Sequence, residues 1–493
     1  MENRQSVLYL TPKSSYYSKK EEVLRENVAL HDNLFKEDRL LYTYLLYFTN
    51  STYYSKSLIF ERLLKNSLHK EENQHYVVAD PKLIEVEDAL IEYVLKNENI
   101  TYVFKTLMHL KRTKVSNPRT SKIILKFIFN RTNTDYLALK YKKKIKALLY
   151  HALGQATVAK IINHDKDALI KFHKLTGIYS YPNPVEVVEF ACNVNKEYKS
   201  TYFNEYIKIR QQFAEGTYKF TNTHLPIEVL MGFNNNFKTK YSSGALLSSG
   251  NISNKQKIQL QRFSKKENSN IQVLVDLNKY SIEELYKYMY NAELTFEEVM
   301  NCRNIIETKA QAIRKLIAKN FIFELDKCAI ILDCSDSNAG TYESKLNPFY
   351  KNLTMASIFR NQEGDNLFLA GGHYKDALLY PSGHTDLTTP LIEVVEKGYR
   401  NILIVSDGFE NVGDFNKVYS KLNDLGYGLN AVHFNPVFSP KNLSFKTLGE
   451  KVPTIPFVNE KDIDNLLLFL YLNTDKELFK TTIRKRIDSE LLV

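Results

Sequence analysis

The chain has 493 residues, of which 44% are hydrophobic and 25% charged, a composition typical of a folded globular protein with room for two or three domains. It contains no run of about 18 uninterrupted apolar residues, the length that a membrane-spanning helix requires. The four cysteines form no CxxC pair, which favours reduced thiols over a disulfide framework. The N-terminus lacks the apolar segment of a secretory signal. These features argue against a membrane protein and predict a cytoplasmic location.

The net charge of +11 is divided unevenly along the chain. Residues 316–493 contain 19 of the 67 Lys and Arg residues and 23 of the 56 Asp and Glu residues, a net charge of −4, which leaves +15 for residues 1–315. Charges of opposite sign predict different partners for the two parts.

Most of residues 1–318 is predicted to be helical, because apolar residues recur at a spacing of three to four. The predicted helices include 19–36, 83–96, 100–113, 119–130, 135–151, 185–192, 197–213, 282–290 and a long helix that starts at Phe296. No fixed-period repeat is visible. The prediction of an all-α array of the HEAT-like helical-repeat kind over residues 1–318 therefore rests only on the succession of helices.

Residues 319–493 have a different pattern. Apolar runs typical of buried strands occur at 328–333, 366–370, 401–406 and 429–434, and helical patterns lie between and after them at about 387–397, 413–425 and 460–472. Strands that are too apolar to have a solvated face, and that alternate with helices, predict a doubly wound parallel sheet of Rossmann-like α/β type. Ligands of such sheets bind at the carboxyl ends of the strands.

Three segments of this second domain place oxygen-bearing side chains where strands end or where a loop precedes a helix. DCSDS at 333–337 supplies Asp333, Ser335 and Ser337, GHTDL supplies Thr385, and IVSDG supplies Asp407. Two carboxylates and three hydroxyls are hard donors of low total charge, which suit Mg²⁺ or Mn²⁺, or Ca²⁺, better than zinc. The sequence therefore predicts a divalent-cation site. Asp386, beside Thr385, is predicted to support the site from behind its ligands or to lie at the N-terminus of a helix, and not to be a ligand itself.

This set of residues resembles the metal-ion-dependent adhesion site (MIDAS) of von Willebrand factor A (vWA) domains. The resemblance implies that Ser335 and Ser337 bind the metal directly, Thr385 directly or through water, and Asp333 and Asp407 mostly through waters. It also implies that the metal holds an acidic side chain of a protein partner. The sequence departs from the family at Asn338-Ala339-Gly340, where an apolar residue usually follows the motif.

Enzymatic use of the same residues is the less favoured interpretation. Asp333 follows a buried strand like the nucleophile of haloacid-dehalogenase-like hydrolases, but Ser335 stands where those enzymes have a second acid. His373 and His384 are candidate bases, although loop histidines are more often surface residues. We expect no catalysis, and a metal-dependent phosphohydrolase stays as a minor alternative.

The most basic stretch lies at residues 105–146, where Asp135 is the one acidic residue among 13 Lys and Arg residues. The predicted nucleic-acid-binding residues are Lys111, Arg112, Lys114, Arg119, Lys122, Lys126, Arg131, Lys140, Lys142, Lys143, Lys144 and Lys146, with Phe127, Phe129, Tyr136, Tyr141 and Tyr150 interleaved. Such charge binds phosphate backbones, and aromatic rings stack on unpaired bases. RNA is favoured over DNA because no sequence-specific DNA-recognition motif is present. A solvated basic face, an acidic protein or a phospholipid surface would account for the same charges.

A helical array joined to a C-terminal vWA domain in about 500 residues is similar to the Ro/TROVE family of RNA-binding proteins. The segments KALLYHALGQATVAKII (146–162) and THLPIEVLMGF (223–233) resemble its helical repeats. This resemblance implies a ring of helices that binds small noncoding or misfolded RNA in a ribonucleoprotein. We therefore expect a non-enzymatic RNA-binding scaffold with a magnesium-dependent protein-interaction site. The alternative is a vWA adaptor that works with a MoxR-type ATPase or another protein complex without RNA.

Overall fold

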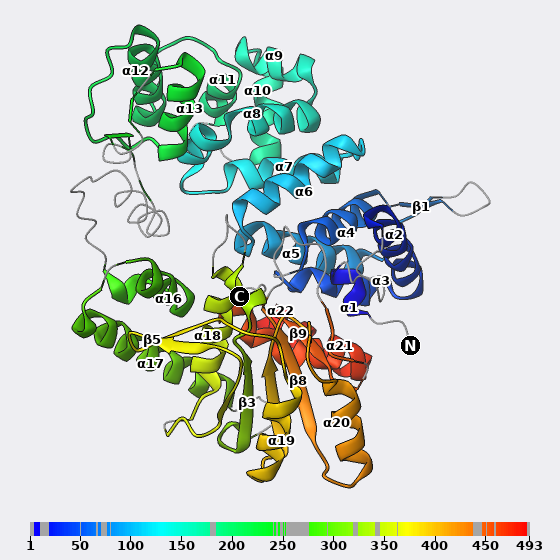
Figure 1. The fold of residues 1–493 in the computed structure, drawn as a ribbon. Helices are drawn as coiled ribbons and strands as arrows, with labels where there is room; N and C mark the ends of the chain where they lie inside the picture. The colour runs from blue at the N-terminus through cyan, green and yellow to red at the C-terminus, as the bar shows by residue number, and fades with distance from the viewer. Residues whose placement is uncertain are drawn as a thin grey trace. The chain divides into compact units, whose positions relative to one another are not determined.

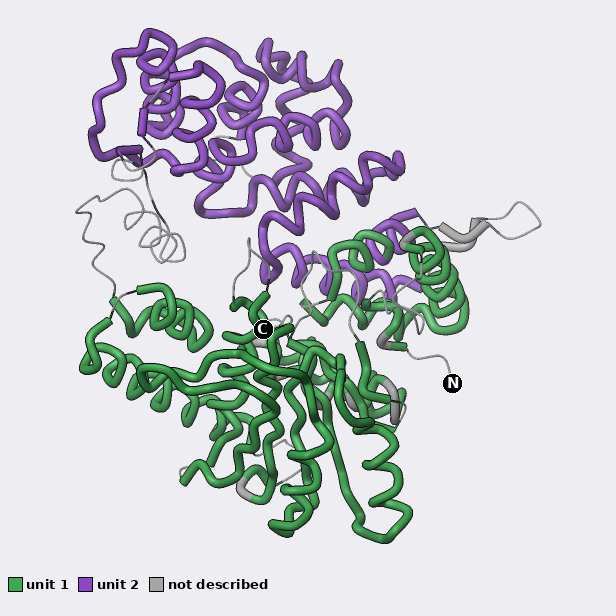
Figure 2. The backbone as a smooth tube through the Cα atoms, in the orientation of Figure 1, with its two compact units in different colours: residues 1–58, 276–493 green, residues 59–275 purple. Residues whose placement is uncertain are grey.

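The computed structural model describes residues 4–9, 19–49, 51–65, 68–70, 76–78, 80–177, 184–239, 241–242, 245–246, 250, 252, 276–292, 294–318, 324–340, 346–361, 363–436, 446–449, 451–457 and 460–490. The chain forms two compact units (Figure 2). Residues 1–58 together with 276–493 form one, the α/β unit, and residues 59–275 form the other, the helical unit. A helical region and an α/β region are both present, as the sequence predicts.

The core of the α/β unit is a five-stranded parallel sheet with the strand order β4-β3-β7-β8-β9 (Figure 1). The strands are β3 (Cys328–Asp333), β4 (Leu367–Ala370), β7 (Asn401–Val405), β8 (Asn430–Asn435) and β9 (Thr454–Pro456). All six residues of β3 are buried. The first four strands lie close to their predicted bounds, whereas β9 was not predicted because its three residues form too short an apolar run. β5 (His373–Lys375) and β6 (Leu378–Tyr380) form a separate antiparallel hairpin.

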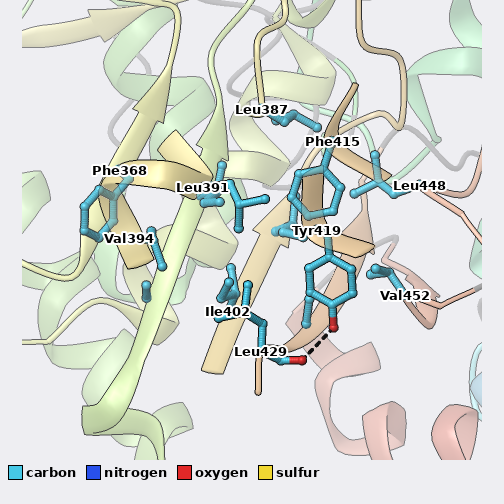
Figure 3. Packing of buried hydrophobic residues seen from close by; sticks show 14 of the residues in the cluster. Phe368, Leu387, Leu391, Val394, Ile402, Phe415, Tyr419, Leu429, Leu448 and Val452 are labelled. Atoms are coloured by element: carbon cyan, nitrogen blue, oxygen red, sulfur yellow. Dashed lines mark hydrogen bonds between the residues drawn. The ribbon is translucent and has the colours of Figure 1, made fainter. Parts of the chain in front are cut away.

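Helices cover both faces of this sheet. On one face, α19 (Thr388–Glu396) and α20 (Phe415–Asp424) contribute Leu391 and Phe415 to a hydrophobic cluster that includes Ile331 of β3 (Figure 3). On the other face, α18 (Asn347–Phe359) packs on β3 and β7. Its Phe359 ring stacks on Phe434 of β8 with the ring centroids 5.5 Å apart. Burial on both sides explains the continuous apolar pattern of these strands.

The α/β unit also includes helices from the first part of the chain. α1 (Gln5–Leu8), α2 (Lys20–Glu37), α3 (Arg39–Tyr44) and the start of α4 (Tyr53–Lys65) belong to it, as do α16 (Ile282–Asn291) and α17 (Phe296–Ala318). α16 and α17 both pack against α18. The structure therefore divides at residues 58 and 276 and not at the expected boundary of 318. That boundary followed the change from helix to strand patterns, which does not reveal which helices the sheet contacts.

Aromatic stacking joins the N-terminal helices to the last two helices of the chain, α21 (Leu466–Thr474) and α22 (Lys476–Glu490). The Phe48 ring stacks on Phe469 and Phe479, with centroid distances of 4.2 and 5.9 Å. Asp38 Oδ2 forms ion pairs with Lys476 Nζ and Lys480 Nζ at 2.6 and 2.7 Å. Residues far apart in sequence therefore form one core.

The helical unit consists mainly of nine consecutive helices in the part of the chain that is described. They are α5 (Pro81–Asn97), α6 (Ile100–Arg112), α7 (Pro118–Phe129), α8 (Thr134–Leu153), α9 (Gln155–Ile162), α10 (Lys166–Thr176), α11 (Pro184–Ala191), α12 (Thr201–Glu215) and α13 (Ile227–Phe237). A short antiparallel hairpin of β1 (Leu68–Lys70) and β2 (Tyr76–Val78) precedes them. Asn99, Asn117 and Asp165 cap helix starts by accepting backbone N–H groups.

The two units differ in the sign of their net charge. The helical unit contains 34 of the 67 Lys and Arg residues and 19 of the 56 Asp and Glu residues, a net charge of +15, which leaves −4 for the α/β unit. None of the described helices is both long and apolar enough to cross a membrane.

Replacing Phe48 by Ala should destabilise the α/β unit by about 3–5 kcal/mol, because the change removes a buried ring between two others. Hydrogen exchange of the β3 and β7 amides, followed by mass spectrometry, measures the effect. Leu478→Ala is the control, since Leu478 lies on α22 next to Phe479, a partner of Phe48, but is 41% exposed. Unchanged protection of β3 and β7 in Phe48→Ala would show that the N-terminal helices do not stabilise the sheet.

Candidate functional site

The two candidate aspartates lie where neighbouring strands end. β3 and β7 pair in parallel along their length, so both leave the sheet at the same edge. Asp333 is the last residue of β3, and Asp407 follows β7 by two positions. Asp333 is 0% exposed and Asp407 is 6% exposed. Two carboxylates are therefore held close together in a largely buried position.

The three candidate hydroxyls connect these carboxylates. Ser335 Oγ lies 2.6 Å from Asp333 Oδ1 and 3.1 Å from Ser337 Oγ. Thr385 Oγ1 lies 2.7 Å from Ser335 Oγ, and Ser337 hydrogen-bonds the Asp407 carboxylate. Ser335 and Thr385 are buried, whereas Ser337 is exposed. The structure brings together all five residues of the predicted cation site, with Ser337 on the solvent side.

The spacing of these oxygens suits a six-coordinate cation. Mg²⁺ binds oxygens at about 2.1 Å in an octahedron, so neighbouring ligand oxygens lie about 2.9 Å apart. Ser335 Oγ lies 3.1 Å from Ser337 Oγ and 2.7 Å from Thr385 Oγ1, close to that value. Within the described ranges, no three His, Cys, Asp or Glu side chains gather as ligands for any metal ion, so a cation here would depend on the hydroxyl oxygens. Hydroxyl and carboxylate oxygens are donors of the kind that suits Mg²⁺ or Mn²⁺.

Ser406 is an additional hydroxyl of this site that was not predicted. Its Oγ donates to Asp333 Oδ2 at 2.9 Å and accepts the Gly408 N–H at 3.1 Å. Its carbonyl accepts His433 Nε2 at 2.9 Å, while His433 Nδ1 lies 3.0 Å from the Thr454 hydroxyl. Burial lowers the pKa of His433 to about 4, so the ring is neutral. The place of Ser406 directly before Asp407 in IVSDG is the sequence signal that would have identified this hydroxyl.

Two asparagines hold the loop that follows β3. Asn352 Nδ2, from α18, donates to the Asp333 carbonyl at 2.8 Å and to Asn338 Oδ1 at 3.0 Å. Asn338 Nδ2 reaches Ser335 Oγ at 3.4 Å. Both asparagines are 0% exposed. The departure from the vWA pattern at Asn338 is therefore matched by a polar partner on α18.

Backbone hydrogen bonds position the Thr385 loop. The Asp336 N–H donates to the Gly383 carbonyl at 3.0 Å. The N–H groups of Asn411 and Val412 donate to the Thr385 carbonyl at 3.0 and 3.1 Å. The loops after β3, β6 and β7 are therefore tied to one another around the candidate site.

Three other polar residues near the motifs lie outside the cluster. Asp386 accepts the Thr388 N–H at 2.9 Å, at the start of α19, so of its two predicted roles the structure shows that of a helix N-terminal acid. His373 Nδ1 lies 3.0 Å from Ser382 Oγ, and His384 is exposed.

The cluster carries unfavourable negative charge. Burial, together with the charge of Asp333, raises the pKa of Asp407 to about 6, and hydrogen bonds from the Phe409 N–H and from Ser337 oppose this shift. Near neutral pH, Asp407 is therefore ionised at an energetic cost, which a bound cation would offset.

The predicted nucleic-acid-binding residues all lie on α6, α7, α8 or the connections between them. Lys111, Arg112, Lys114, Lys122 and Lys143 are exposed. Phe127 and Phe129 are 3% and 2% exposed, so these two rings belong to the core and are not available to stack on bases.

Four other predicted residues are bound within the helical unit. Arg119 forms ion pairs with Glu87 and Asp88 at 3.0 and 2.8 Å. Lys126 pairs with Glu92, Lys140 pairs with Glu228, and Arg131 donates to the Leu95 carbonyl. These interactions give the four side chains a role in stabilising the helical unit, so their presence in the basic stretch does not require a nucleic acid.

Comparison of the sequence with models of known protein families gave no match. Comparison with curated protein sequences gave none either.

Asp407→Asn should stabilise the metal-free protein at pH 7.5 by about 1–3 kcal/mol, since a pKa raised by about two units corresponds to about 3 kcal/mol. Because folding raises the pKa of Asp407, the contribution of this residue to the stability of the metal-free wild type is most favourable below about pH 4 and is lost as the pH rises through about 6. Mg²⁺ should restore that stability in the wild type but not in Asp407→Asn. Urea denaturation in chelator and in Mg²⁺, across this pH range, measures all three. A variant that is less stable than the wild type in chelator at pH 7.5 would contradict the expected repulsion.

Proposed function

We propose that this protein is a non-catalytic binding protein in which the α/β unit is a vWA-like module. Ser335, Ser337 and Thr385 would hold a divalent cation with the support of Asp333 and Asp407. When bound, the cation supplies a coordination position for a carboxylate of a protein partner.

The observation that carries this proposal is the convergence of these five oxygen-bearing side chains from three separate loops. Each side chain arrives at the same edge of a parallel sheet, where ligands of such folds bind. Both carboxylates accept hydrogen bonds from protein hydroxyls and N–H groups, which hold the geometry of the cluster. Three of its five side chains are neutral hydroxyls, so its total charge is low for a cation site. A site of low charge retains affinity for an external carboxylate.

The surroundings of the site suit a protein partner. Phe409 and Val412, on the loop after Asp407, are 46% and 47% exposed. Lys446 Nζ lies 4.2 Å from the centroid of the Phe409 ring. Exposed apolar side chains beside a cation favour an acidic residue with apolar neighbours on the partner.

The hydrogen bonds of the site argue against catalysis. Asp333 accepts hydrogen bonds on both carboxylate oxygens, from Ser335 and from Ser406. His433 donates through Nε2 to a carbonyl and is held neutral. Among the hydrogen bonds of the described residues, none joins a histidine to Asp333 or Asp407. The arrangement suits a static ligand cluster more than a nucleophile with its base.

For the helical unit, we propose RNA binding in the manner of the Ro family. Its support is the net charge of +15 and the exposed residues Lys111, Arg112, Lys114, Lys122 and Lys143. A vWA adaptor for an ATPase would need no such excess, so this charge favours the RNA-binding scaffold.

Ser337→Ala should weaken the affinity for Mn²⁺, followed by electron paramagnetic resonance, by about 10–100-fold, since one hydroxyl ligand is lost. It should also abolish the Mg²⁺-dependent association with protein partners, followed by cross-linking and mass spectrometry. Ser489→Ala, which removes an exposed hydroxyl from α22, is the control. Partners that stay bound in chelator and in Ser337→Ala would contradict a metal-dependent adhesion site.

The purified protein should bind single-stranded or structured RNA at low salt, with an affinity that falls steeply as salt rises, because bound phosphates release counterions. Filter binding across a salt series, together with sizing of any nucleic acid that co-purifies, measures this. Absence of RNA binding at low salt, combined with Mg²⁺-dependent partners, would favour the adaptor without RNA.

A further inference from the structure

Three cationic side chains gather where α8, α11 and α12 meet in the helical unit. Lys142 and Lys146 come from one side of α8, and Arg210 comes from α12. Lys146 lies one turn after Lys142 on α8, and Lys142 Nζ lies 4.8 Å from the ring centroid of Tyr206, which is one turn before Arg210 on α12. The charges of Arg210 and Lys146 both act on Lys142. Lys142 and Lys146 are half-buried and Arg210 is exposed. The cluster therefore faces solvent while its base lies within the unit.

Aromatic side chains hold Lys142 in place. Its Nζ lies 4.0 Å from the centroid of Phe190 and 4.8 Å from that of Tyr206. Phe190 is itself stacked on Phe203, with ring centroids 4.0 Å apart and planes 4° from parallel. Cation–π contacts with a rigid ring pair give the ammonium group a defined position, although they do not neutralise its charge.

The neighbouring hydroxyl and thiol add polar groups without negative charge. The Tyr150 hydroxyl hydrogen-bonds the Cys192 thiol, and Lys142 and Lys146 both act on this thiol. Burial raises the pKa of Cys192, so the thiol stays protonated near neutral pH.

The carboxylates on the adjacent elements are engaged elsewhere. Glu189 pairs with His164 and Lys196 at 3.1 and 2.5 Å. Glu186 accepts the backbone N–H groups of Lys199 and Ser200.

Glu205 accepts the Thr223 hydroxyl at 2.7 Å. In the described part of the chain, no Asp or Glu forms an ion pair with Lys142, Lys146 or Arg210, whereas Lys140 on the same helix pairs with Glu228.

An unneutralised cluster of this kind is unfavourable by itself. Burial and the charges of Arg210 and Lys146 lower the pKa of Lys142 to about 8. A bound anion would remove this repulsion, and the planar guanidinium of Arg210 is suited to contact two oxygens of one tetrahedral anion.

We propose that Lys142, Lys146 and Arg210 form a binding site for a phosphate group of a single-stranded RNA. The proposal rests on the RNA binding proposed above and assigns it to one place on the helical unit. The other exposed basic residues, such as Lys111 and Lys122, contribute attraction that depends on charge and not on position.

The test compares variants of the full-length protein in binding a fluorescein-labelled oligouridylate across a salt series. Lys142→Gln and Arg210→Gln should each weaken binding about tenfold, the effect of one charge-assisted hydrogen bond. Each should also reduce the salt slope by about 0.7, the value for one lost phosphate contact on a single strand. Arg210→Lys should fall between the wild type and Arg210→Gln, because it keeps the charge but loses the planar fork.

Lys208→Gln is the matched control. Lys208 is an exposed cation on α12, the helix that carries Arg210, and is not among the predicted nucleic-acid-binding residues. It loses the same charge, so it should weaken binding less than about twofold, as expected of general attraction. Thermal unfolding by circular dichroism confirms that all variants are folded.

Three outcomes would overturn the proposal. If the wild type binds the oligomer but Lys142→Gln and Arg210→Gln behave as Lys208→Gln does, the site is wrong while RNA binding stands. If uridine monophosphate or inorganic phosphate binds the wild type as tightly as the oligomer does, the ligand is a small phosphate compound. If the wild type binds no RNA at low salt, both this site and the proposed RNA binding fail.

Discussion

The parallel pairing of β3 with β7 is the constraint on which the candidate metal site depends. Because the two strands end at one edge, Asp333 and Asp407 are held close together in a buried position, where their charges repel. Hydroxyls from Ser335, Ser337 and Ser406 offset part of this cost through hydrogen bonds. A cation bound at the proposed site would offset the rest, so the cost of holding the two carboxylates together and the proposed affinity for a metal would have the same origin.

The two proposed ligands of this protein have opposite charge and belong to separate compact units. The α/β unit, with a net charge of −4, contains a cluster suited to a cation, and the helical unit, with +15, contains clusters suited to anions. Hydroxyls hydrogen-bond the carboxylates of the acidic cluster, whereas aromatic rings contact Lys142 in the basic one. In both places, the protein fixes the position of a charge without neutralising it, which leaves that charge available to an outside partner.

Local patterns were sufficient to predict much of this structure. The apolar runs at β3, β4, β7 and β8 and the helical spacing along α5 to α8 predicted their elements, and the motifs around Asp333, Thr385 and Asp407 predicted which side chains converge. Contacts between segments far apart in the sequence could not be predicted from these patterns. Nothing in the pattern of α17 indicates that it packs on α18, and nothing near Arg119 indicates its ion pair with Glu87. Asn352 supports the metal-site loop from α18, and its role depends on packing alone.

Phe48 and its partners Phe469 and Phe479 have a consequence for synthesis of the chain. The α/β unit is discontinuous, since residues 59–275 lie between its two parts. During translation, the whole helical unit leaves the ribosome before the first strand of the parallel sheet has been made. The N-terminal helices must meanwhile remain without the C-terminal aromatic rings that cover them. The helical unit is thus complete in sequence before the candidate cation site exists, so the order of the chain sets the order in which the two units can assemble.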